Sequence, residues 1–177
     1  MRAFLAINIS DEVREHLADL QYQVKLTNRG KGTYSAPENF HMSLAFLDEI
    51  TKDQADILMR VLKTQLAEHK PFDLKLNKLG YFADESAATL WCSVNPSNDL
   101  KSLVSDVYSS VRDARIHFDS KPFKAHITLG RKINLMNCRL ADIQVKELSF
   151  HIDSVSLYKS TLTPTGPIYE EIASIKL

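Results

Sequence analysis

Alternating apolar and polar residues predict β-strands along much of this 177-residue chain. The clearest case is residues 72–82, FDLKLNKLGYF, where the two kinds of side chain alternate as on a strand with one face in water. Similar patterns predict strands at about residues 2–9, 39–47, 72–82, 88–95, 124–131, 143–151, 153–160 and 167–176.

Apolar residues at helical spacing predict three helices between these strands. Serine and threonine are good N-caps, and proline marks the end of a helix, so these residues indicate the boundaries. The helices are expected from Ser10 to about residue 27, from Thr51 or Asp53 to Pro71, and after Ser97 across Leu100 to Val111.

Two parts of the chain repeat the order strand, helix, loop, strand. RAFLAINIS leads through a helix and a loop to FHMSLAFL, and ATLWCSVN leads in the same way to FKAHITLGR. This repeat predicts an internal duplication within one domain that spans residues 1–177. The expected fold is α+β: two pseudo-symmetric lobes of antiparallel β-sheet line a central cleft, and the helices lie on the outside.

Composition narrows the classes of ligand. The chain has 22 Lys and Arg residues and 22 Asp and Glu residues, whereas proteins that coat long nucleic acids carry a large positive excess. A short anionic ligand remains compatible with this balance. With 44% hydrophobic and 25% charged residues, the composition is that of a soluble globular protein.

The cellular setting is also suggested by what the sequence lacks. The N-terminal residues do not resemble a signal peptide, and no apolar run is long enough to span a membrane. Cys92 and Cys138 have neither the number nor the spacing of a disulfide framework or a metal site. We therefore expect a cytoplasmic monomer without a metal, a cofactor or a membrane partner.

A histidine followed two residues later by a hydroxyl occurs at the same place in both repeats. The motifs are His41-Met42-Ser43 and His126-Ile127-Thr128. Residues two apart on a strand share a face, so each histidine should lie beside its hydroxyl while the intervening apolar residue faces the core. If the lobes are related by a twofold axis, both pairs should converge on one pocket.

Two imidazoles and two hydroxyls without a carboxylate fit few kinds of site. A metal site built on two histidines normally recruits an acid or a cysteine, and a serine nucleophile normally needs an acid to orient its histidine. Hydroxyls can instead donate to a phosphate, while one imidazole acts as general base and the other as general acid. This pattern predicts cleavage of a phosphodiester.

The duplicated His-x-Ser/Thr motif, with its apolar neighbours, resembles the 2H phosphoesterase superfamily. The flanking sequences RAFLAI, NFHMSLAFL, HITLGR, SLYKS and GPIY are similar to its LigT-like branch, the RNA 2′,3′-cyclic phosphodiesterases of bacteria and archaea. The resemblance implies metal-independent opening of 2′,3′-cyclic phosphate at RNA ends, with a 2′-phosphate left behind and no cofactor.

The resemblance also implies the roles of four residues. His41 and His126 would form the acid–base pair, and Ser43 and Thr128 would bind phosphate oxygens. Family members often have threonine in both motifs, whereas the first motif here has Ser43. Serine keeps the hydroxyl donor but lacks the β-methyl that restricts its rotamer, so we expect slightly looser positioning and unchanged chemistry.

Phe46 and Arg131 each follow their motif's hydroxyl by three positions, which makes them counterparts in the repeat. They could stack on the two faces of a base. Alternation alone places Phe46 with the core residues, so core packing is its alternative. For Arg131 the alternative is a solvated surface charge, although Lys121, Lys124 and Lys132 lie near it in sequence and suggest a basic rim.

Three other functions stay compatible with this sequence. The same pocket could join RNA ends through a 2′,5′ linkage, could act on small cyclic-phosphate nucleotides, or could bind RNA ends without catalysis. Substitution of His41 and His126 separates an enzyme from a binding module, because acid–base histidines typically contribute about 10²-fold or more to the rate.

Overall fold

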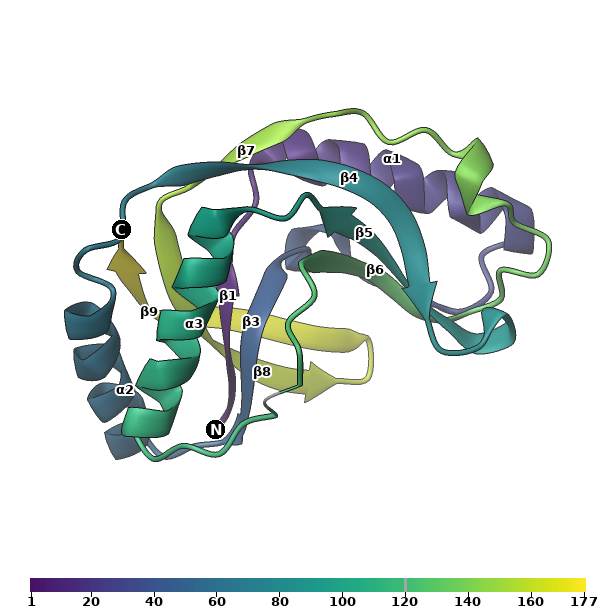
Figure 1. The fold of residues 1–177 in the computed structure, drawn as a ribbon. Helices are drawn as coiled ribbons and strands as arrows, with labels where there is room; N and C mark the ends of the chain where they lie inside the picture. The colour runs from purple at the N-terminus through teal and green to yellow at the C-terminus, as the bar shows by residue number, and fades with distance from the viewer. Residues whose placement is uncertain (120) are drawn as a thin grey trace.

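Two antiparallel β-sheets form the frame of the molecule (Figure 1). The computed structural model describes residues 1–119 and 121–177. One sheet has the strand order β3-β1-β8-β9 and the other β2-β6-β5-β4-β7. The strands are β1 (Arg2–Ile7), β2 (Thr33–Tyr34), β3 (Met42–Glu49), β4 (Phe72–Phe82), β5 (Ala88–Val94), β6 (His126–Ile133), β7 (Ser149–Ile152), β8 (Ser154–Thr163) and β9 (Gly166–Lys176).

Three α-helices in the described residues are capped where the sequence predicts. They are α1 (Asp11–Asn28), α2 (Lys52–Gln65) and α3 (Asn98–Asp113). The hydroxyl of the preceding serine or threonine accepts a hydrogen bond from the first turn in each helix, and at α2 a glutamine completes a capping box. The predicted α+β class, with antiparallel sheets and helices on the outside, is confirmed.

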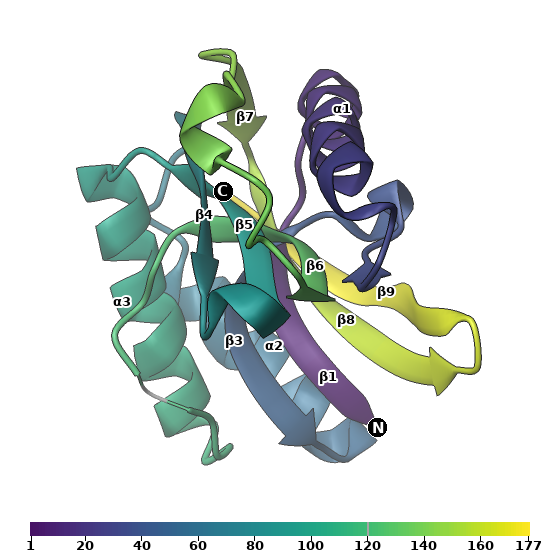
Figure 2. The ribbon, with the colours of Figure 1, turned by 90° about the vertical axis from the view of Figure 1, so that its right-hand side faces the viewer.

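The helices of the two repeats are exchanged between the lobes. Helix α1 follows β1 but lies against β6 of the other sheet, and α3 follows β5 but lies against β3 and α2. Figure 2 shows α1 and α3 on opposite sides of the strands. The first helix of each repeat therefore packs on the lobe formed by the other repeat, and these contacts connect the two lobes.

The structure differs from the predicted boundaries in three main places. Helix α2, expected to extend to Pro71, ends at Gln65, and the chain turns at residues 66–68 before it reaches the proline. The strand expected at about residues 39–47 begins only at Met42, because Pro37–Asn39 form a 3-10 turn just before it. The strand expected at about 143–151 is confined to Ser149–Ile152. The segment before it instead crosses α1, where the Lys146 N–H donates to His16 Nε2 at 2.9 Å.

One apolar core connects the two sheets. Fully buried side chains from the first sheet, such as Leu5 and Met42, belong to the same cluster as Leu90 and Ile127 from the second. In the described part of the chain, no helix is long and apolar enough to cross a membrane.

Candidate active site

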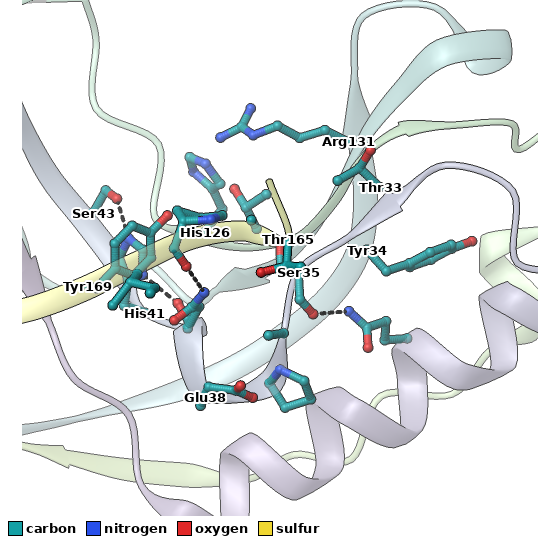
Figure 3. Close-up of a pocket in the computed structure, with 18 of the residues that line it drawn as sticks. Thr33, Tyr34, Ser35, Glu38, His41, Ser43, His126, Arg131, Thr165 and Tyr169 are labelled. Carbon is teal, nitrogen blue, oxygen red and sulfur yellow. Dashed lines mark hydrogen bonds between the residues drawn. The ribbon is translucent and has the colours of Figure 1, made fainter. Parts of the chain in front are cut away.

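The concave side of the molecule holds a cavity of about 880 Å³ between the two lobes (Figure 3). Its wall includes residues from α1, the β2 segment, β3, β6 and the tip of the β8–β9 hairpin. All six residues singled out from the sequence line this one cavity: His41, Ser43, Phe46, His126, Thr128 and Arg131.

Both histidines sit where a strand begins. His126 is the first residue of β6, and His41 directly precedes β3. Strand alternation then turns Ser43 and Thr128 toward the cavity, while Met42 and Ile127 are fully buried beneath it. The two motifs therefore meet around one space, as the duplication predicts.

A β-bulge follows the hydroxyl residue in both strands. In β3, Ser43 pairs with Ala6 of β1 and Ala45 pairs with Leu5, so Leu44 has no opposite residue. In β6, Thr128 pairs with Trp91 of β5 and Gly130 pairs with Leu90, so Leu129 is skipped in the same way. Two residues then oppose one, so the residues that follow present the opposite face, up to a second register shift further along each strand.

The bulges decide where Phe46 and Arg131 point. Uninterrupted alternation would place Phe46 in the core with Met42 and Leu44, and that interpretation is wrong: its side chain is 55% exposed and lines the cavity. Arg131 reaches the same cavity after the bulge at Leu129. A pattern of apolar residues carries no sign of a bulge, so the sequence alone left this choice open.

A backbone carbonyl two residues upstream holds each catalytic candidate ring. His41 Nδ1 lies 2.7 Å from the Asn39 carbonyl oxygen, and His126 Nδ1 lies 2.6 Å from that of Lys124. A carbonyl only accepts, so Nδ1 carries the proton in both rings. Each neutral imidazole therefore has its lone pair on Nε2.

The two Nε2 atoms differ in their partners. His41 Nε2 lies 2.8 Å from Ser43 Oγ, so in the neutral ring it accepts the serine hydroxyl proton. His126 Nε2 makes no hydrogen bond to residues 1–119 or 121–177, and Thr128 is not bonded to it. The similarity between the two motifs thus ends at the two Nε2 atoms.

Aromatic rings pack against both imidazoles. Phe4 stacks on His41 with ring centroids 4.9 Å apart, and Tyr169 contacts it edge-on at 5.3 Å. On the other side Phe82 meets His126 edge-on at 5.1 Å. Such packing restricts the rings to few orientations.

Burial lowers the pKa of both His41 and His126 below the ordinary value of 6.5. The carbonyls on Nδ1 oppose this by favouring the charged ring, while the Arg131 guanidinium lowers the pKa of both further. Both rings are therefore mainly neutral at pH 7 until an anion enters, and a bound phosphate would favour protonation of one of them.

Two further contacts position the segment that carries His41. The Arg14 guanidinium donates to the carbonyl oxygens of Pro37 at 2.8 Å and Phe40 at 3.1 Å. The Asn39 amide donates to the Pro167 carbonyl in the hairpin tip at 3.0 Å. The approach to the first motif is thus fixed to α1 on one side and to the β8–β9 hairpin on the other.

Several cavity residues were not identified from the sequence. Only one residue of the expected basic rim, Arg131, lines the cavity; Lys121, Lys124 and Lys132 do not. The additional lining residues come from α1, from the segment that leads to β3 and from the tip of the β8–β9 hairpin, and none of them belongs to a repeated motif, although GPIY, which contains Tyr169, was noted as a flanking similarity. They are Gln21, Lys25, Thr33, Tyr34, Ser35, Ala36, Pro37, Glu38, Asn39, Thr165, Gly166, Pro167, Ile168 and Tyr169.

Within the described ranges, no three His, Cys, Asp or Glu side chains are grouped so that they could hold a metal ion. The cavity instead presents imidazoles, hydroxyls and the Arg131 guanidinium. These groups can bind an anion, accept a proton and donate one.

The sequence is similar to a family of phosphoesterases. Residues 9–163 match the model of the 2'-5' RNA ligase superfamily. A Thermotoga maritima protein named RNA 2',3'-cyclic phosphodiesterase is 30% identical over 175 residues, which cover 96% of this chain and 92% of that protein. An Archaeoglobus fulgidus protein of the same name is 31% identical over 180 residues, or 97% and 98% of the two chains.

Solved structures show the same fold. A crystal structure of a Thermus thermophilus protein is 26% identical and superposes with a TM-score of 0.84 over 100% of this chain and 98% of the other. Escherichia coli LigT complexed with 3'-AMP has a TM-score of 0.81 at 21% identity, with 99% and 97% covered. The second likeness concerns the fold alone.

Proposed function

The chain belongs to the 2'-5' RNA ligase superfamily, and from this premise we propose that it opens 2′,3′-cyclic phosphate ends of RNA by metal-independent hydrolysis, leaving a 2′-phosphate. The names of the curated relatives support cyclic phosphodiesterase activity. The observation that carries the two-histidine mechanism is the convergence of His41, Ser43, His126 and Thr128 on one cavity.

His126 is the general base in this mechanism. Its Nδ1 proton is held by the Lys124 carbonyl, and its Nε2 lone pair is not engaged by the described residues. Water attacks the phosphorus as His126 Nε2 takes a proton from it, and the new P–O bond forms on one side of the phosphorus. The lowered pKa keeps this ring neutral, as a base must be, near pH 7.

His41 is the general acid. The bond between phosphorus and the 3′-oxygen breaks, and protonated His41 donates its Nε2 proton to that oxygen. The base then carries the proton taken from water, and exchange with solvent restores both rings. When His41 is protonated, its Nε2 no longer accepts from Ser43, so the serine hydroxyl becomes free to donate to a phosphate oxygen.

The two motif hydroxyls bind the phosphate, and Phe46 and Arg131 hold the base. Ser43 and Thr128 donate to the non-bridging oxygens, where negative charge develops during the displacement. Phe46 and Arg131, one from each lobe, are the proposed stacking partners of the terminal base. The exposed Phe46 ring supports this role, because a large apolar side chain gains from a ligand that covers it.

The test is an RNA oligonucleotide that ends in a 2′,3′-cyclic phosphate, incubated with the protein in excess EDTA. We expect a single product with a 2′-phosphate, identified by ³¹P NMR, and loss of the activity in His41→Ala and His126→Ala. A 3′-phosphate product would contradict the assigned leaving group. Activity lost in EDTA and restored by a divalent ion would contradict the metal-free mechanism.

A parallel reaction with an added 5′-hydroxyl oligonucleotide tests joining by a 2′,5′ linkage. If hydrolysis is the principal reaction, the added strand should leave the yield of 2′-phosphate almost unchanged. Binding of the cyclic end without any product would indicate a non-catalytic module.

A further inference from the structure

We propose that the part of the cavity formed by Lys25, Thr33 and Tyr34, here called the Lys25 subsite, binds the phosphodiester that precedes the cyclic end. The inference rests on the proposed function and specifies its substrate: an RNA chain of at least two nucleotides rather than a free cyclic nucleotide.

The cavity extends well beyond the reacting groups. Its volume of about 880 Å³ lies near the top of the range of about 300–1,000 Å³ found for small-molecule pockets. Figure 3 shows Tyr34 across the cavity from His41, Ser43 and Tyr169, with Thr33 beside Arg131. A nucleotide held at the histidines and Arg131 therefore leaves the region around Tyr34 for the next part of the chain.

Lys25 supplies an uncompensated positive charge to this region. Its ammonium lies over the Tyr34 ring, 4.9 Å from the centroid, and lines the cavity. No carboxylate oxygen of the described residues lies within 4.0 Å of it. Glu38 also lines the cavity but forms no ion pair with Lys25. A lysine held on a ring and free of a carboxylate suits a phosphate, which it binds as a point charge.

The walls of the Lys25 subsite are already ordered. The Tyr34 hydroxyl donates to Asn28 Oδ1 at 3.0 Å, and β2 is paired with β6. The Gln21 amide donates to the carbonyls of Ser35 at 2.7 Å and Leu129 at 2.8 Å, so it ties the β2 segment to β6 from below. Because these side chains are already held in place, a ligand that binds here loses little free energy to ordering them, and this favours affinity.

The Thr33–Arg131 pair continues the path from the reacting groups. Thr33 of β2 is paired with Arg131 of β6, and both residues line the cavity. Arg131 lies on the same strand as Thr128, three residues along. The cavity wall thus runs from Arg131, the proposed stacking partner of the terminal base, through Thr33 and Tyr34 to Lys25, where the preceding phosphodiester would lie.

Lys25 also lies in the last turn of α1, where a cation interacts favourably with the helix dipole. That role alone would not distinguish substrates. Lys63 provides a matched control, because it is an exposed lysine in the last turn of α2, does not line the cavity, and would lose the same dipole interaction.

The experiment compares kcat/KM for uridine 2′,3′-cyclic monophosphate and for the dinucleotide UpU ending in 2′,3′-cyclic phosphate. We expect the wild type to prefer the dinucleotide by about tenfold or more. Lys25→Gln should abolish most of that preference, mainly through a higher KM for the dinucleotide. Lys63→Gln should retain it. The salt dependence of dinucleotide KM should also weaken in Lys25→Gln, because one phosphate contact is lost.

Equal kcat/KM for both substrates in the wild type, or a preference that survives in both Lys25→Gln and the charge-reversed Lys25→Glu, would overturn the Lys25 subsite and leave the proposed function intact. Failure of the wild type to open either substrate would instead overturn the proposed function, and the subsite with it. Far-UV circular dichroism of each variant verifies that it is folded.

Discussion

At the scale of single residues, the two histidines are alike in their support and different in their freedom. Both donate Nδ1–H to a carbonyl two residues upstream, so the sequence repeat extends to the tautomer. Only His41 has Nε2 engaged, by Ser43. The proposed division of roles follows from this one difference.

The division predicts how each variant responds to a better leaving group. If sulfur replaces the 3′-bridging oxygen of the cyclic phosphate, the leaving thiolate needs little protonation. His41→Ala should then regain most of the activity that it loses with the oxygen substrate, about 10²-fold or more. His126→Ala should remain slow with both. Rescue of His126→Ala instead, measured by single-turnover kinetics, would reverse the assignment.

His16 predicts a pH dependence of stability that is separate from catalysis. Burial, together with Lys146, lowers the pKa of His16 below 6.5, and its Nε2 accepts from the Lys146 N–H. The folded protein thus binds fewer protons than the unfolded chain below pH 6.5. The contribution of His16 to the free energy of unfolding is therefore fully present above pH 6.5. It declines as the pH falls from 6.5 toward the lowered pKa of His16 in the folded protein.

Urea unfolding at pH 7.5 and at several values below 6.5 measures this effect. His16→Gln, which keeps an acceptor but does not titrate, should lose less stability on acidification than the wild type. The lowered pKa values of His41 and His126 act in the same direction, so some decline will remain. Identical acid dependence in both proteins would show that His16 does not contribute.

At the scale of elements, the site is positioned by the two β-bulges and by hydrogen bonds that hold the turn before β3. Arg14 of α1 holds the carbonyls of Pro37 and Phe40, directly ahead of His41. Hydrogen bonds from a charged donor contribute about 1.5–3 kcal/mol, so Arg14→Met should lower the free energy of unfolding by about that amount.

The same change should also lower kcat, because the His41 ring loses its fixed approach to the substrate. Arg60→Met is the control: Arg60 is exposed on α2 and its side chain makes no hydrogen bond to the described residues. Urea unfolding and steady-state kinetics give the two measurements. An unchanged kcat in a destabilised Arg14→Met would limit Arg14 to a structural role.

At the scale of the whole molecule, the exchanged helices and the shared core predict cooperative unfolding. Leu58 is fully buried on α2, whereas Trp91, the one tryptophan in the sequence, lies on β5 of the other sheet. Leu58→Ala should cost about 2–5 kcal/mol. If the chain is one domain, the urea midpoints of Trp91 fluorescence and far-UV circular dichroism should shift together. Separate transitions would show that the two lobes unfold independently.

Local patterns determined much of this protein in advance. Strand alternation, helix caps and the repeated unit predict the α+β fold, and they place a histidine and a hydroxyl on one face of each of two related strands. These features depend on residues within a few positions of one another, so the sequence displays them directly. The boundary at residues 143–148 failed because a contact with distant His16 directs that segment across α1.

Contacts between distant segments decided the rest. Phe46 faces the cavity only because β3 bulges at Leu44 against β1, and Lys25 reaches the cavity only because α1 lies against the other lobe. The spacing of apolar residues predicts neither the bulge in β3 nor the position of α1, because it indicates whether a residue is buried and not which distant strand or helix it contacts. The sequence by itself therefore determined the helices, the strands and the paired motifs. Only the tertiary structure decided the shape and the extent of the site, because strand register and helix packing join residues that are far apart in the chain.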